Sequence, residues 1–68
     1  MYKNLKAEMT RAEITQRELA KALGIHENSA RNKLIGMSAF TVEEAFIIKN
    51  RFFKNIELDY LFRVEKAS

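Results

Sequence analysis

With 68 residues and a formal net charge of +3, the chain is long enough for one small domain. It has no Cys and one His, which excludes a disulfide framework and disfavours a metal centre. It has no Pro and only two Gly, and helix-forming residues dominate, so we expect an all-α fold rather than a strand-rich one. The longest apolar run covers residues 45–48, too short to span a bilayer, and no secretory signal is visible.

The positive charge is concentrated in the first half of the chain. Residues 1–36 contain seven Lys and Arg against four Asp and Glu, whereas residues 37–68 contain five of each. A one-sided basic field favours a polyanionic partner such as nucleic acid, and ordinary surface charge is the alternative interpretation.

The first two predicted helices have clear local signals. Apolar residues at helical spacing predict the first helix from Lys3 to Arg11. The second begins after Thr15, which forms a capping box with Glu18: the Thr hydroxyl accepts from the Glu18 amide, and the Glu carboxylate accepts from the Thr15 amide. Gly24 is expected to end this helix, where a left-handed backbone is needed.

The third helix is predicted from Glu27 to Ile35, with His26 as its N-cap. Its apolar face is narrow, because only Ala30 and Leu34 lie four residues apart on one side. Gly36 is expected to end it.

A second capping box, Thr41 to Glu44, starts a fourth helix that runs to about residue 52, and a short fifth helix is predicted over residues 58–63. We expect the fourth helix to bury an apolar stripe and the fifth to close the core. The stripe comprises Val42, Ala45, Ile48 and Phe52, widened by Phe46 and Phe53, and the fifth helix contributes Leu58, Leu61 and Phe62. Ile47 falls on the opposite side of the fourth helix.

The unit of greatest interest is residues 15–36. Ala20 is small where two helices would cross closely, Gly24 permits a sharp reversal, and Ile25 fills the gap between the helices. This pattern predicts a helix-turn-helix, whose second helix has the right width for the major groove of DNA. The predicted DNA-binding residues are Gln16, Arg17, His26, Glu27, Asn28, Ser29, Arg31, Asn32 and Lys33.

These residues have chemistry suited to DNA. Gln16 and Arg17 would meet a phosphate at the N-terminus of the second helix. Lys33, near the end of the third helix, is expected to contact another phosphate. Asn can pair with adenine and Arg with guanine, so Asn28, Asn32 and Arg31 are expected at base edges. Ser29 suits a base or a phosphate, and His26 a cap or a DNA contact. Glu27 would either accept from cytosine or lower nonspecific affinity.

The chain resembles the Cro and lambda-type repressor family, also called the xenobiotic-response-element family, in its phage- or prophage-associated members. The similar segments cover nearly the whole chain: ITQ (14–16), ELA (18–20), LGI (23–25), KLIG (33–36), FTVEEA (40–45) and LDYLF (58–62). The resemblance implies a compact five-helix, lambda-repressor-like domain over residues 1–68, double-stranded operator DNA as ligand, homodimeric binding, and the bacterial cytoplasm.

The resulting hypothesis is a sequence-specific transcriptional regulator, and we expect a Cro-like repressor that occludes an operator. The alternative is a protein-interaction module on the same fold, for an antirepressor or a toxin. We expect no enzymatic activity, cofactor, metal, membrane or small-molecule ligand, because no nucleophile–base set or Gly-rich phosphate loop is present. The aromatic residues exceed the needs of a thin core, so Ile47, Phe53 and Tyr60 are predicted at a dimer interface.

Overall fold

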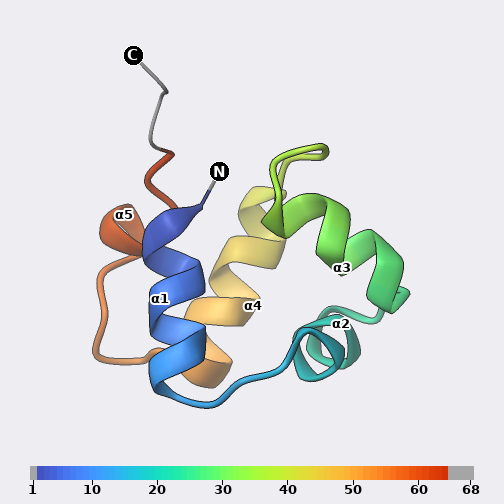
Figure 1. Cartoon of the computed structure of the whole chain (residues 1–68). Coiled ribbons are helices and arrows are strands. Elements are labelled where there is room, and N and C mark those ends of the chain that lie inside the picture. Colours follow the sequence, from blue (N-terminus) through green and yellow to red (C-terminus); the bar gives the residue numbers. More distant parts are fainter. Residues whose placement is uncertain (1, 65–68) are drawn as a thin grey trace.

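Within residues 2–64, which the computed structural model describes, the chain forms five α-helices and no strand (Figure 1). They are α1 (Lys3–Arg11), α2 (Gln16–Leu23), α3 (Glu27–Leu34), α4 (Val42–Phe52) and α5 (Leu58–Leu61). The all-α class and the five helices are confirmed, although α3 ends one residue and α5 two residues before the predicted ends. The Cα radius of gyration is 11.0 Å, and a compact chain of this length should have ~11 Å.

The helices are arranged in two groups joined by α4. α2 packs against α3 on one side of the molecule, α1 packs against α5 on the other, and α4 contacts both α2 and α5 (Figure 1). None of the helices in the part of the chain described is long and apolar enough to cross a membrane.

Both predicted capping boxes are present. At α2, the Thr15 hydroxyl accepts from the Glu18 amide at 3.1 Å, and the Glu18 carboxylate accepts from the Thr15 amide at 3.0 Å. These hydrogen bonds lower the pKa of Glu18, so the carboxylate stays charged at the positive end of the helix. Thr41 and Glu44 form the same pair at α4, with distances of 3.0 and 2.9 Å.

The helices α1, α2 and α3 all end in the same hydrogen-bonded turn, with one residue in the left-handed conformation. Gly24 (φ 69°) ends α2, and the next amide, that of Ile25, donates to the Ala20 carbonyl at 3.0 Å. Gly36 (φ 90°) ends α3 in the same way, as predicted. At the end of α1 the left-handed position is occupied by Glu13 (φ 57°), followed by an Ile14 amide that donates to Met9 at 2.8 Å.

Glu13→Gly is therefore expected to stabilise the protein by about 0.5–1 kcal/mol, because a non-glycine residue pays a steric cost in this conformation. Chemical denaturation would measure the gain. The matched control is Gly24→Ala, which should destabilise by about 1 kcal/mol through backbone strain alone, since a Cβ there meets no atom within 4 Å. A Glu13→Gly variant no more stable than the parent protein would contradict the turn geometry.

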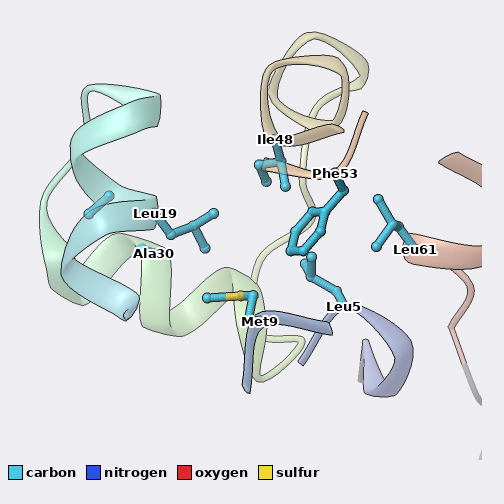
Figure 2. Close-up of a cluster of buried hydrophobic side chains, with 8 residues drawn as sticks. Leu5, Met9, Leu19, Ala30, Ile48, Phe53 and Leu61 are labelled. Atoms are coloured by element: carbon cyan, nitrogen blue, oxygen red, sulfur yellow. The ribbon is translucent and has the colours of Figure 1, made fainter. Parts of the chain in front are cut away.

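The buried core joins all five helices. Phe53 lies between Ile48 and Leu5, with Leu61 beside it, and Leu19 points toward this group from α2 (Figure 2). Its members are Leu5, Met9, Leu19, Ala20, Ala30, Ile48, Phe53 and Leu61.

The predicted apolar stripe of α4 is too wide. Ala45, Ile48 and Phe53 are buried, but Val42 is 72% exposed and Phe46 is 48% exposed. Within residues 2–64, α4 packs mainly against α2 and α5, and this packing leaves most of the Val42 side chain and about half of the Phe46 side chain uncovered. Leu61 closes the core as predicted, and Phe62 packs against it, whereas Leu58 is only half-buried and lies outside the core cluster.

An unpredicted polar cluster joins α1 to α5. Glu8 is buried, and one of its carboxylate oxygens accepts from Tyr60 Oη at 2.9 Å and from Arg11 at 2.9 Å. The hydrogen bond to Glu8 raises the pKa of Tyr60. Asn4 adds a bond from its side-chain amide to the Tyr60 carbonyl at 2.8 Å.

The positions of Phe53 and Tyr60 in the structure do not fit the predicted dimer interface. Phe53 is only 4% exposed in the centre of the core, so it cannot contact a second chain. Tyr60 is half-buried, and its hydroxyl is bonded within the fold. Ile47 is half-buried on α4.

Candidate nucleic-acid interface

The side of the molecule opposite α5 is formed by α3 (Figure 1). Its anchor is small: Ala30 is fully buried, and Leu34 is a half-buried neighbour of the core. The anchor leaves most of the polar side chains of α3 in solvent. Glu27, Asn28, Ser29 and Arg31 are exposed, and Asn32 is half-buried. A short turn through Gly24, Ile25 and His26 holds α3 against α2.

The start of α2 lies beside the start of α3. Gln16, the first residue of α2, is half-buried, and Arg17 is exposed. Arg17 Nε lies 3.8 Å from Glu27 Oε1, and both side chains are largely in solvent. This ion pair was not predicted, and it gives Glu27 a cationic partner on α2.

A groove of about 340 Å³ runs between α1, the start of α2 and α3. Lys6 and Thr10 line it from α1, Gln16 from α2, and Arg31 from α3. Its apolar lining comprises Met9, Ile14, Leu34 and Ile35. Two cations and two neutral hydrogen-bonding side chains therefore line one groove, a combination that suits an anionic strand. Lys6 and Arg31 are far apart in the sequence, so helical spacing alone could not show that they share a groove.

Lys33 is placed differently from the prediction. Its ammonium lies 3.0 Å from Glu44 Oε1, donates to the Ala39 carbonyl at 3.0 Å, and lies 6.0 Å from the Phe40 ring centroid. With its side chain only 15% exposed, Lys33 connects α3 to α4 instead of extending into solvent. We therefore leave it out of the candidate DNA-binding set.

The Lys33–Glu44 pair predicts a dependence of stability on pH. Burial raises the pKa of Glu44, but hydrogen bonds from Thr41 and Lys33 outweigh that effect and bring it below the usual 4.5. The charged form therefore stabilises the folded protein above pH 4.5, and this contribution is lost as the pH falls through the lower folded value. Glu44→Gln keeps an acceptor for the capping box and removes the charge.

We expect Glu44→Gln to lower the free energy of unfolding by about 1 kcal/mol at neutral pH, and to show a shallower loss of stability on acidification below pH 4.5 than the parent protein. Urea denaturation at several pH values would measure both effects. Glu43→Gln is the matched control, because Glu43 is the exposed neighbour and forms no ion pair within residues 2–64. Parallel pH profiles for the parent protein and Glu44→Gln would contradict the role of the pair.

His26 lies at the N-cap position of α3 with an extended backbone, but its side chain forms no capping hydrogen bond. The capping part of its prediction is therefore wrong, and the imidazole is exposed beside Glu27. Within residues 2–64, no group of three His, Cys, Asp or Glu side chains is placed to hold a metal ion.

The comparisons with known proteins found no relative. No family model matches the sequence, and neither a curated protein nor a solved structure matches it significantly.

Proposed function

We propose that the protein is a sequence-specific, double-stranded-DNA-binding regulator of transcription. In this proposal α2 and α3 form a helix-turn-helix like that of Cro-type repressors, and the bound protein occludes an operator in the bacterial cytoplasm. The observation that carries the proposal is the placement of α3, which is held by Ala30 and leaves Asn28, Ser29 and Arg31 exposed to solvent.

The outer side of α3 provides the base contacts. An α-helix fits the major groove of B-DNA, where each base pair presents a distinct pattern of donors and acceptors. Asn28 offers an amide that can bond adenine at two points, and Arg31 a guanidinium that can do so with guanine. Ser29 and Asn32 would contribute secondary contacts beside these two residues.

The start of α2 provides the phosphate contacts. Its first amides point out of the helix, and their partial positive charge attracts a phosphate. Gln16 and Lys6 line the groove between α1, α2 and α3 and add side-chain donors. These contacts would orient α3 along the groove but would not distinguish one base pair from another.

The pairing of Glu27 with Arg17 supports a sequence-specific role over a purely electrostatic one. A carboxylate beside the phosphate-binding cation weakens attraction to DNA in general. The ion pair is 3.8 Å long and exposed, so a correctly placed phosphate can compete for Arg17. Of the two roles predicted for Glu27, this geometry favours lowering nonspecific affinity.

Selection of bound duplexes from a random library, followed by titration at several salt concentrations, tests the proposal. We expect enrichment of one sequence, and a log Kd that changes with log salt by about 0.9 per phosphate contact. Equal affinity for unrelated duplexes would indicate a nonspecific nucleoid protein. Absence of binding even at low salt would indicate a protein-interaction module.

A further inference from the structure

The groove between α1, the start of α2 and α3 has an apolar lining that phosphate contacts do not use. α1 and α3 do not pack closely against each other, and the groove occupies the space between them. Met9 is buried, Ile14 and Leu34 are half-buried, and Ile35 is 40% exposed. A phosphate is held by cations and hydrogen-bond donors, so the proposed contacts with DNA leave these apolar side chains without a role.

The charged side chains of this groove are two cations without a partner. Lys6 and Arg31 are exposed, and neither side chain forms an ion pair or a hydrogen bond within residues 2–64. By contrast, Arg11, Arg17 and Lys33 each lie beside a carboxylate. None of the described residues that line the groove is acidic. Its positive charge is therefore not compensated at close range, and it favours an anionic ligand.

Each of these cations lies next to apolar side chains of its own helix. Lys6 is three residues before Met9 on α1. Arg31 is three residues before Leu34 and four before Ile35. Residues at these spacings are neighbours on a helix surface, and all of them line the same groove. A ligand that contacts both kinds of side chain must combine an apolar body with a negatively charged group.

We infer that the groove binds a small amphipathic carboxylate, with its hydrocarbon body against the apolar lining and its charged end at Lys6 and Arg31. A planar carboxylate matches the two parallel donors of a guanidinium. Contact between the hydrocarbon and the apolar lining provides favourable free energy, while the charged hydrogen bonds fix the orientation. The volume of about 340 Å³ lies at the small end of the range of ligand sites, which is about 300–1,000 Å³.

Two residues of the groove, Gln16 and Arg31, also belong to the candidate DNA-binding set. A bound carboxylate would occupy Arg31 and lower the affinity for DNA, so the ligand would regulate DNA binding. This consequence rests on the proposed function, whereas the binding of the carboxylate does not. The sequence predicted no small-molecule ligand, and helical spacing could not show a groove that residues of distant segments line together.

An NMR titration of the isotope-labelled full chain with sodium decanoate, in the absence of DNA, tests the inference. We expect saturable binding of one decanoate per chain, with a Kd of about 1 mM or lower, and the largest amide shifts at the residues that line the groove. Lys6→Gln and Arg31→Gln should each raise this Kd about fivefold or more, because each removes a charge-assisted contact. Ile35→Ser should also raise it, through lost apolar contact.

Two probes and one variant are the controls. Decanol has the same hydrocarbon chain without the charge, so it should bind more weakly and its Kd should not change in Lys6→Gln. Acetate has the charge without the chain and should give no saturable shift. Lys21→Gln removes an exposed lysine outside the groove and should bind decanoate like the wild type. Circular dichroism should show that all the variants are folded.

Amide shifts spread evenly over the surface, or equal decanoate binding by Lys6→Gln and Lys21→Gln, would overturn the inference. In a second measurement, decanoate should displace the selected duplex, and simultaneous binding of both would contradict the overlap at Arg31. A chain that binds decanoate but no duplex contradicts the proposed function alone. A chain that binds the duplex but not decanoate contradicts this inference alone.

Discussion

The variant Leu19→Ala is expected to unfold a large fraction of the molecules at room temperature. Leu19 has no exposed surface and lies where α2 meets the rest of the core (Figure 2). Truncating a buried leucine to alanine costs about 2–5 kcal/mol, through lost burial and the cavity left behind. A domain of this size without disulfide or metal has roughly 3–5 kcal/mol in total. The loss is therefore comparable to the whole free energy of unfolding.

Urea denaturation followed by far-UV circular dichroism would measure this loss. Met37→Ala is the control, because an exposed apolar side chain should change the free energy of unfolding by no more than about 0.5 kcal/mol. Leu19→Ala should also abolish DNA binding, although Leu19 is not in the proposed interface, because α3 is anchored through Ala30 to the same core cluster. An unchanged denaturation midpoint would show that the core does not depend on this position.

Local features of the fold were predictable, because the interactions that form them join residues only a few positions apart. The Thr15–Glu18 capping box and the left-handed Gly24 are examples, and both are present as predicted. Glu13 was missed at the equivalent turn of α1, since glutamate carries no signal for a left-handed backbone.

Tertiary placement was less predictable. Helical spacing identifies an apolar face, but the width that becomes buried depends on which neighbours cover it. Val42 and Phe46 therefore stay exposed, although they share the apolar pattern of Ile48. Phe53 follows the last residue of α4, and the change in backbone there (φ −135°, ψ 53°) accompanies its placement in the core.

Polar contacts between distant segments left no signal in the sequence. The bond between Tyr60 and Glu8 joins residues 52 positions apart, and the Lys33–Glu44 pair joins two helices. Composition and spacing indicated that Lys33 was a cation on α3, but only the fold shows that its charge is already paired. Of the three residues of this helix that were expected at base edges, Asn28 and Arg31 are exposed and Asn32 is half-buried.

In the candidate site, Arg31→Ala is expected to give the largest change in DNA specificity. Arg31 is exposed on α3 and also lines the groove with Lys6 and Gln16. If its guanidinium bonds a guanine, the variant should lose about 1–3 kcal/mol of discrimination at a single base pair, roughly 5–150-fold in relative Kd. Titration against the selected duplex and its single-base-pair substitutions would measure this loss.

The pattern of loss separates a base contact from a phosphate contact. A base contact makes the variant tolerate every base at one position, while affinity for an unrelated duplex changes little. A phosphate contact weakens binding to all duplexes alike and reduces the salt dependence by about 0.9. Arg63→Ala is the control, because it removes the same charge from an exposed position just after α5, and α5 lies on the side of the molecule opposite α3 (Figure 1). If Arg31→Ala and Arg63→Ala weaken binding equally, the effect is one of net charge, and α3 does not contact the bases through Arg31.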